Sequence, residues 1–274
     1  MAIKVFVDSG SSIKQNEKEK YNVEIFPLKI LLNDKEYLDG IDLSMDIFYD
    51  ELINNKKSPK TSLPNLAECE AKVLECINNG DDVIILTISS GISGTYNAMN
   101  LLFKDNNKVK VIDTQTAVGG IRILINEINK YRDQPINFIV DKINNLIPRI
   151  RVYAVPETLD YLHRGGRLGK FSYIAGTVLS LKPVIELKHK VSVAAKTFGL
   201  IRAMRDLLNR LEECDTNYPI VPSYTYDDTN LDKLISKSSE KYQKAMIEKD
   251  NIDPAIAAHW GPNAFGYIFV AKEK

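Results

Sequence analysis

The first half of the chain alternates short apolar runs with amphipathic stretches. The run Asp82–Ile88 is almost entirely apolar, which is typical of a strand covered on both faces of a sheet. The strands predicted in this half are Ile3–Asp8, Glu24–Leu31, Asp82–Ile88 and Lys108–Ile112. The predicted helices are Ser44–Asn55, Leu66–Asn78, Ser93–Lys104, Thr116–Tyr131 and Pro135–Ile147. Because strands and helices alternate, we expect a parallel sheet with helices on its faces.

The second half is richer in strands. The predicted strands are Arg151–Val155, Pro183–Leu187, Lys190–Lys196, Ile220–Tyr226 and Gly266–Ala271, and the predicted helices are Leu200–Cys214 and Asn230–Met246. The segment Val184–Lys196 is typical of a hairpin that turns near Lys188–Lys190. We therefore expect an α/β protein of two domains, with an N-terminal parallel-sheet domain over residues 1–150 and a C-terminal α+β domain over residues 151–274.

Composition narrows the class of protein. The chain has 274 residues, of which 44% are hydrophobic and 26% charged, close to the average soluble globular protein. No apolar run reaches the roughly 18 residues that a membrane span needs, so we expect no stable membrane insertion. The first residues become charged too soon for a signal peptide, and three cysteines are too few for a disulfide framework. A cytoplasmic protein fits these features best.

The charge is balanced overall but unevenly distributed. The 36 basic and 36 acidic side chains give a formal net charge of zero, which argues against binding nucleic acid through bulk charge. Residues 1–150 carry 18 basic and 21 acidic side chains, and residues 211–274 carry 7 and 11. Residues 151–210 carry 11 basic and 4 acidic side chains, so the middle segment is strongly basic.

The most informative motif is the turn Ser89–Tyr96, which follows a predicted strand and opens a predicted helix. Its glycines allow the backbone to approach a ligand, and N–H groups at the start of a helix favour an anion. A phosphate or a carboxylate suits such a turn, although Ser93 could instead simply cap the helix. The turn is not a G-x-S-x-G nucleophile elbow, because Thr95 stands where that motif has its second glycine. It is not a P-loop, because no lysine follows Gly94.

Two further segments carry polar groups next to proline or glycine. The loop Pro59–Asn65 presents Thr61 and Ser62 to a ligand, or else forms an ordinary capping turn. In the segment Ala258–Asn263, His259 is either a ligand contact or a structural histidine. With three histidines in the chain and no second ligand at a metal spacing, we expect no metal site.

The basic middle segment contains the last two motifs. The stretch Glu157–Lys170 includes Arg164-Gly165-Gly166-Arg167, a turn that can hold phosphate or an acidic partner surface, or can form a solvated loop. The following stretch Phe171–Leu187 is mostly apolar. It either belongs to the core or lines a tunnel for a long apolar ligand, and composition does not separate these two interpretations.

The ordered set of motifs resembles the DegV family of fatty-acid-binding proteins. The matching pieces are Asp8-Ser9, Thr61-Ser62-x-Pro64, Ser89-Ser90-Gly91-Ile92-Ser93-Gly94-Thr95-Tyr96, Asp113-Thr114, Glu157-Thr158-Leu159-x-Tyr161-Leu162-x-Arg164-Gly165-Gly166-Arg167, Lys182-Pro183 and His259-x-Gly261-Pro262. Each piece alone is weak, but the set in this order is specific, and it extends from about residue 3 to the C-terminus.

This resemblance implies a DegV-like fold of two domains that hold one long-chain fatty acid. It implies that the chain has no catalytic residues and no cofactor, and that it presents the acyl carboxylate to a separate ATP-dependent kinase. In that respect the chain resembles the fatty-acid-binding subunit of a bacterial fatty-acid kinase system, whose kinase is related to dihydroxyacetone kinases and supplies acyl phosphate for phospholipid synthesis. The residues expected to bind the carboxylate are Thr61, Ser62, Ser93, Gly94 and His259. The N-terminal domain would supply these head-group loops and the C-terminal domain the acyl-chain cavity.

We also expect a basic surface near the mouth of the ligand site that attracts the kinase, formed by Arg164, Arg167, Arg202 and Arg205. Two other classes of function remain open from the residues alone. One is an enzyme that acts on a small carboxylated or phosphorylated metabolite at the Ser93 turn, with His259 as its general base. The other is a partner-binding protein without a ligand, which uses the basic segment.

Overall fold

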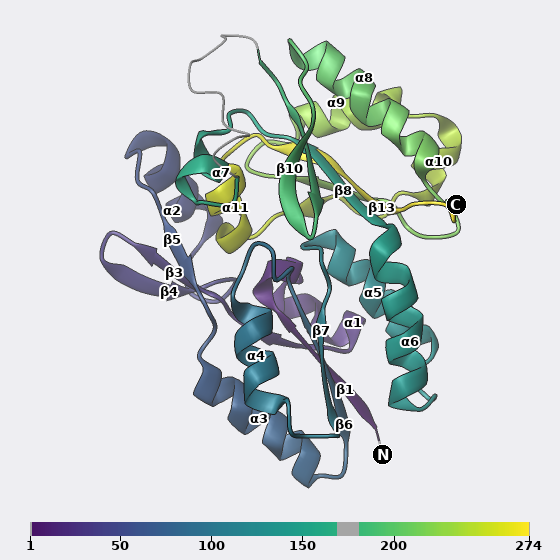
Figure 1. Ribbon diagram of the computed structural model, residues 1–274. Helices are drawn as coiled ribbons and strands as arrows, with labels where there is room; N and C mark the ends of the chain where they lie inside the picture. Colours follow the sequence, from purple (N-terminus) through teal and green to yellow (C-terminus); the bar gives the residue numbers. More distant parts are fainter. Residues whose placement is uncertain (1, 169–180, 274) are drawn as a thin grey trace.

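The computed structural model describes residues 2–168 and 181–273, which form three sheets with helices packed around them (Figure 1). Sheet A contains β1 (Ile3–Asp8), β2 (Glu24–Phe26), β6 (Asp82–Thr87) and β7 (Val109–Asp113) in the order β2-β1-β6-β7. All its pairings are parallel, which confirms the predicted parallel sheet. The central strand β6 is buried on both faces, as its apolar sequence predicted.

Helices cover both faces of sheet A. On one face, α3 (Leu66–Asn78) and α4 (Thr95–Phe103) pack against alternate strand residues such as Phe6 and Ile85. On the other face, Val7 and Ile84 meet α5 (Gly119–Lys130), and α6 (Ile136–Leu146) packs outside α5. The short helical segments nearby are η1 (Ser9–Ser11), η2 (Gln15–Glu17), α1 (Lys18–Tyr21) and η4 (Ile147–Arg149).

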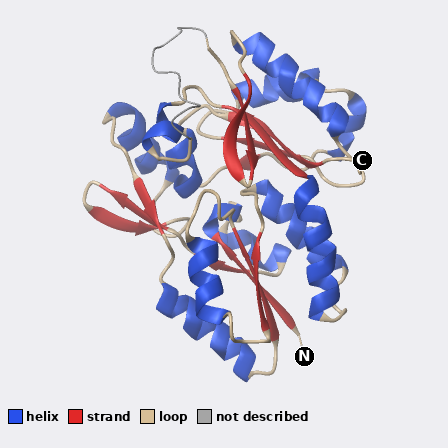
Figure 2. Ribbon diagram, in the orientation of Figure 1, coloured by secondary structure: helices blue, strands red, loops and turns tan. Residues whose placement is uncertain are grey.

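Sheet B is a small antiparallel sheet at one side of the molecule (Figure 2). It contains β3 (Lys29–Leu32), β4 (Lys35–Leu38) and β5 (Lys60–Ser62) in the order β4-β3-β5. The chain between β4 and β5 forms α2 (Met45–Tyr49) and the π-helical turn η3 (Asp50–Asn54). Strand β5 carries Thr61 and Ser62, two of the predicted site residues.

Sheet C is formed by the second half of the chain. Its strands are β8 (Ile150–Val155), β9 (Val184–Lys188), β10 (Lys190–Ala195), β11 (Val221–Tyr224), β12 (Asp250–Asn251) and β13 (Phe265–Val270), in the order β10-β9-β8-β13-β11-β12. The predicted hairpin is confirmed, since β9 and β10 pair antiparallel around His189. The outer face is covered by α8 (Leu200–Arg210), η5 (Leu211–Glu213), α9 (Thr229–Lys237) and α10 (Glu240–Ala245).

The inner face of sheet C turns toward the N-terminal half. There it meets α7 (Asp160–Arg164) and α11 (Pro254–Trp260), and side chains of both halves join in one hydrophobic cluster. The strands of sheets A and B end by residue 113 and those of sheet C begin at residue 150, where the domain boundary was predicted. The continuous cluster places the inner face of sheet C, α11 and the end of sheet A around a common interior (Figure 1).

Three differences between the predicted elements and the structure have a clear physical reason. The strand expected over Glu24–Leu31 is wrong as one element, because Pro27, which has no N–H to donate, separates β2 in sheet A from β3 in sheet B. The helix expected over Asn230–Met246 is two helices that break at Ser238, where the backbone is extended. No helix was predicted over α11, whose seven residues are too few to show a helical period.

Candidate functional site

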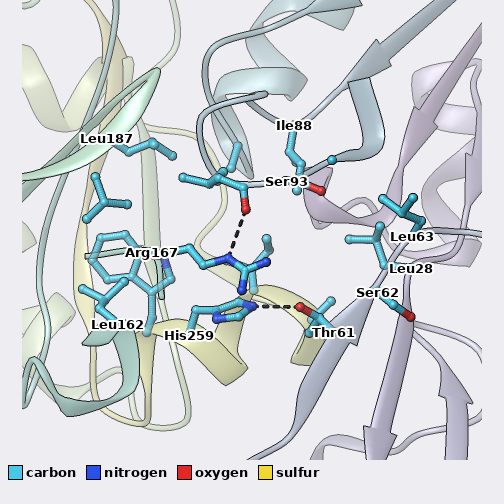
Figure 3. A pocket seen from close by; sticks show the side chains of 17 residues that line it. Leu28, Thr61, Ser62, Leu63, Ile88, Ser93, Leu162, Arg167, Leu187 and His259 are labelled. Atoms are coloured by element: carbon cyan, nitrogen blue, oxygen red, sulfur yellow. Dashed lines mark hydrogen bonds between the residues drawn. The ribbon is translucent and has the colours of Figure 1, made fainter. Parts of the chain in front are cut away.

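A cavity of about 330 Å³ lies where the three sheets approach one another (Figure 3). Most of its wall is apolar, with leucine, isoleucine and tryptophan side chains from both halves of the chain. Its polar side chains come from β5, the turn before α4, the loop after α7, and α11. They are Thr61, Ser62, Ser93, Arg167 and His259.

Thr61 and His259 are joined directly. Thr61 Oγ1 and His259 Nε2 lie 2.9 Å apart and share a hydrogen bond between β5 and α11. Burial, and secondarily the positive charge of Arg167, lower the pKa of His259 from 6.5 to about 4. The imidazole is therefore neutral near pH 7, and within the described residues its Nδ1 has no hydrogen-bond partner.

Ser93 lies at the entrance to α4. Its Oγ accepts the N–H of Thr95 at 3.3 Å and lies 2.9 Å from Thr95 Oγ1, so the serine does part of the work of a helix cap. It also lines the cavity together with Gly94, which is the N-cap residue of α4. The start of a helix adds free N–H groups and a partial positive charge that favour an anion at this end of the cavity.

Two carboxylates hold the turn before α4 from either side. Asp8, at the end of β1, accepts the N–H of Ile88 at 2.9 Å, and burial raises its pKa to about 7. Asp113, at the end of β7, accepts the N–H of Ser90 at 3.0 Å and its hydroxyl at 2.5 Å. The ends of three neighbouring parallel strands thus fix the segment that carries Ser93.

Residue 91 in the same turn must be a glycine, because the backbone of the β9–β10 hairpin approaches it closely. A Cβ at this position would lie 2.0 Å from the carbonyl oxygen of His189, at the tip of the β9–β10 hairpin. The hairpin is tied there because Ser89 Oγ donates to His189 O at 2.5 Å and His189 N donates to Gln115 O at 2.8 Å. This contact seats the hairpin as one wall of the cavity, with Leu187 and Val191 facing inward.

The helix that carries His259 is fixed by a buried carboxylate. Asp39 accepts the N–H of Ala255, in the first turn of α11, at 3.0 Å, and accepts the hydroxyl of Ser9 at 2.7 Å. Burial, and secondarily the nearby Asp253, raise the pKa of Asp39 to about 7. Sequence patterns did not predict this role, because Asp39 lies in a turn that matches no motif.

Arg167 occupies a different place from the one expected. The sequence predicted a docking residue on the surface, but the side chain is half-buried and lines the cavity, between the Ser93 turn and His259 (Figure 3). Its Nε donates to Ile92 O at 3.0 Å and its Nη1 to Gly165 O at 2.5 Å. It therefore brings a fixed positive charge to the polar region, and burial lowers its pKa without neutralising it.

The other predicted arginines do not form one surface with it. Arg164 is exposed, with its guanidinium 4.9 Å from the ring centroid of Tyr161 and its Nη1 3.3 Å from Ser58 Oγ, close to β5. Arg202 and Arg205 are exposed on α8, which packs on the opposite face of sheet C from the cavity. The four arginines were expected together because they are close in sequence. Sheet C separates Arg202 and Arg205 from Arg164 and Arg167.

A second, smaller cavity of about 30 Å³ adjoins the first. The two cavities share Ala117, Leu187, Ile256 and Trp260 in their walls. The smaller one extends between the inner face of sheet C and the start of α5, among almost exclusively apolar side chains. Part of the predicted lining, residues 171–180, lies outside the described residues, whereas Leu187 does line both cavities.

The described residues contain no group of three or more His, Cys, Asp or Glu side chains placed to hold a metal ion. In the same part of the chain, no helix is long and apolar enough to cross a membrane. All five residues expected to bind a carboxylate line the larger cavity, although residues 61–62, 93–94 and 259 are widely separated in sequence. What the cavity can hold is an elongated apolar molecule with one anionic or strongly polar end.

The chain is similar to known proteins over nearly its whole length. At the level of sequence, the chain is 31% identical to a DegV domain-containing protein of Clostridium acetobutylicum over 98% of this chain and 99% of that protein. It is 32% identical to one of Clostridium perfringens over 99% and 100%.

Among solved structures, a DegV family protein from Thermus thermophilus, described as binding fatty acid, has a TM-score of 0.87 at 25% identity, over 99% and 100% of the two chains. A fatty-acid-binding DegV family protein of Streptococcus agalactiae has a TM-score of 0.86 at 25% identity, over the whole of both chains. The family model described as "Uncharacterised protein, DegV family" matches residues 2–272. The chain therefore belongs to the DegV family.

Proposed function

We propose that this protein binds one long-chain fatty acid and presents its carboxylate to a separate ATP-dependent fatty-acid kinase. The observation that carries the proposal is the gathering of Thr61, Ser93, Arg167 and His259 in one region of an otherwise apolar cavity. The fatty-acid-binding relatives of Thermus thermophilus and Streptococcus agalactiae, which share this fold, support the same ligand class.

The polar region suits a carboxylate. An ionised carboxylate shielded from water needs hydrogen-bond donors or a positive charge, because otherwise it takes up a proton. With its proton on Nε2, neutral His259 donates to Thr61 Oγ1, which leaves the hydroxyls of Thr61 and Ser93 as two donors for the carboxylate. Arg167 supplies the charge, and Ser62 and Gly94 also line the cavity.

The apolar region suits an acyl chain. A chain of sixteen carbons buries about fifteen CH₂ or CH₃ groups, which gives a gross gain on the order of 12 kcal/mol before the costs of association. The larger cavity holds the head group and the first part of the chain, and the smaller apolar cavity marks its continuation under sheet C. In this arrangement the tail supplies affinity and the head-group donors fix orientation.

The proposed partner is a separate ATP-dependent fatty-acid kinase. In this account the protein is a cytoplasmic carrier and not a catalyst, and the kinase uses ATP to form an acyl phosphate for phospholipid synthesis. We expect the kinase to contact Arg164, which is exposed and contacts Ser58, just before the strand that carries Thr61. Arg202 and Arg205 offer a second basic surface on the other side of sheet C.

An enzyme acting on a small metabolite has weaker support. The titratable side chains among the described residues that line the larger cavity are Arg167 and His259. A guanidinium does not act as a base near neutral pH, and an imidazole with a pKa of about 4 is a weak one. Asp8 and Asp113 are occupied by backbone N–H groups of the turn, so they serve its geometry.

Two assays on the purified protein test the proposal in separate parts. Binding of palmitate is measured by titration calorimetry, and acyl-phosphate formation is measured with ATP and a dihydroxyacetone-kinase-like fatty-acid kinase. We expect saturable binding of one palmitate per chain and kinase turnover that depends on the loaded protein. Binding without turnover would reject the presenting role alone, and absence of binding would reject both parts.

A further inference from the structure

We propose that Gly165 is a positioning residue for the head-group region, acting on His259 through its Cα and on Arg167 through its carbonyl oxygen. It lies in the Arg-Gly-Gly-Arg segment at the end of α7, for which sequence patterns suggested phosphate binding, partner binding or a solvated loop. The geometric claim concerns the unliganded protein, and its consequence for ligand affinity rests on the proposed function.

The backbone itself does not require glycine at this position. Gly165 has φ −71° and ψ −9°, a conformation open to any residue. Its neighbour Gly166 differs in both respects, with φ +71° and no atom within 4 Å of a built Cβ. The positive φ explains why residue 166 is a glycine. At residue 165 the reason must be a lack of room for a side chain.

The space is taken by the imidazole of His259. A Cβ at Gly165 would lie 2.3 Å from His259 Nδ1, closer than real Cβ contacts come, and 3.1 Å from both His259 Cε1 and the carbonyl oxygen of Tyr161. The ring is held at one side by Thr61 through Nε2, and within the described residues Nδ1 has no hydrogen-bond partner. The plane of the His259 ring is thus set by packing against the Cα of Gly165. Many other buried histidines are instead oriented by a second hydrogen bond.

The carbonyl of Gly165 fixes the other charged group. It accepts Arg167 Nη1 at 2.5 Å, while Arg167 Nε donates to Ile92 O at 3.0 Å in the turn before Ser93. A displacement of Gly165 would therefore move the imidazole and the guanidinium together. One residue sets the relative placement of two of the groups that face the ligand.

The surrounding packing leaves little freedom to relieve a clash. Just after α11, Gly261 has φ +73°, and a Cβ there would lie 2.3 Å from the ring of Tyr161 on α7. The two helices thus interlock, with the Tyr161 ring against Gly261 and the His259 ring against Gly165. An added methyl group at Gly165 has to displace the imidazole, because α7 and α11 cannot simply separate.

A double-mutant cycle on thermal stability tests the geometry without any ligand. Gly165→Ala should lower the melting temperature by roughly 3–8 °C in the wild-type background. In the His259→Ala background the same change should cost less than half as much, because the clashing ring is gone. Gly166→Ala is the matched control, and its cost should be the same in both backgrounds.

The result that overturns the geometric claim is an equal cost of Gly165→Ala with and without the His259 ring. If Gly165→Ala alone does not fold, the claim requires that the double variant Gly165→Ala/His259→Ala does fold. Failure of that double variant to fold, when His259→Ala folds, also overturns it.

Palmitate affinity then tests the consequence for the ligand. Gly165→Ala should weaken binding about tenfold, through the misplaced imidazole and guanidinium, and Gly166→Ala by less than about threefold. The His259 Cε1–Hε1 NMR signal should move in Gly165→Ala and stay in place in Gly166→Ala. If wild-type protein binds no palmitate, the proposed function fails and the stability cycle still decides the geometric claim. Wild-type affinity in Gly165→Ala, with wild-type protein binding palmitate, would overturn the positioning role.

Discussion

The hydrogen bond between Thr61 and His259 joins two residues that are 198 positions apart in the chain. It links β5 of the small sheet B to α11 at the inner face of sheet C. Because Ser93 and Arg167 line the same cavity, this single contact marks the point where both halves of the chain contribute to one polar region.

Replacing Thr61 and Ser93 together by alanine should weaken palmitate binding by about 100-fold or more. Each hydroxyl is expected to donate to a charged carboxylate, and such bonds contribute about 1.5–3 kcal/mol each. Calorimetric titration measures the change. Ser236→Ala, which removes an exposed hydroxyl on α9, is the control and should leave affinity unchanged. Unchanged affinity in the Thr61→Ala/Ser93→Ala variant would remove both hydroxyls from the site.

Enlarging Ala264 should shorten the longest acyl chain that binds well. Ala264 is buried in the wall of the smaller apolar cavity, so Ala264→Leu fills space that the end of the chain would occupy. Palmitate affinity should fall by about tenfold or more, while decanoate affinity stays within about twofold. Circular dichroism verifies the fold of the variant. An equal loss for both ligands would indicate that the chain takes another path.

The carboxyl of Asp39 should make stability fall as pH rises. Burial raises its pKa from 3.8 to about 7 in the folded protein, so between these values the native state holds a proton that the unfolded chain has released. Unfolding therefore becomes easier as pH increases through this window, by up to about 1.4 kcal/mol per pH unit. Asp39→Asn keeps an acceptor for the Ala255 N–H and removes the titration.

Urea unfolding at pH 5 and pH 7.5 measures this effect. The difference in unfolding free energy between Asp39→Asn and wild type should grow in favour of the variant at the higher pH. Asp34→Asn, an exposed loop carboxyl, is the control and should follow wild type at both values. The same pH slope in wild type and Asp39→Asn would contradict the raised pKa.

Reversing the charge of Arg164 should slow acyl-phosphate formation more than it weakens fatty-acid binding. The side chain is exposed beside Ser58 and does not line the cavity, so its charge is available to an approaching kinase. The rate with Arg164→Glu should fall about tenfold at low salt and recover in part with Arg164→Lys. The double variant Arg202→Glu/Arg205→Glu, tested separately, reports on the opposite face of sheet C. Equal losses of binding and turnover in Arg164→Glu would show a structural role.

Much of the fold follows from local patterns. The apolar run that became β6 and the alternation of strands with α3, α4 and α5 were readable because burial on both faces and helical periodicity leave strong signals. The break at Pro27 was missed because the apolar run continues through it, although the two flanking strands join different sheets. The helix α11 was missed because six of its seven residues are buried, so it shows no polar face.

The site could be predicted only as separate pieces. Thr61, Ser93 and His259 were proposed from motifs that each had an ordinary structural explanation, and only the fold brings them to one cavity. The cavity position of Arg167 depends on the carbonyl groups of Ile92 and Gly165, which no side-chain pattern reveals. Arg202 lies on the far side of a sheet, and proximity in sequence says nothing about that separation.

The mass of the ligand that the purified protein carries tests the central claim most directly. Native mass spectrometry, followed by lipid extraction and fragmentation, measures both the number and the identity of bound molecules. The account predicts one long-chain fatty acid per chain, or uptake of one palmitate by protein stripped of lipid. A protein that is isolated without lipid, and that takes up no palmitate after stripping and refolding controls, would contradict it.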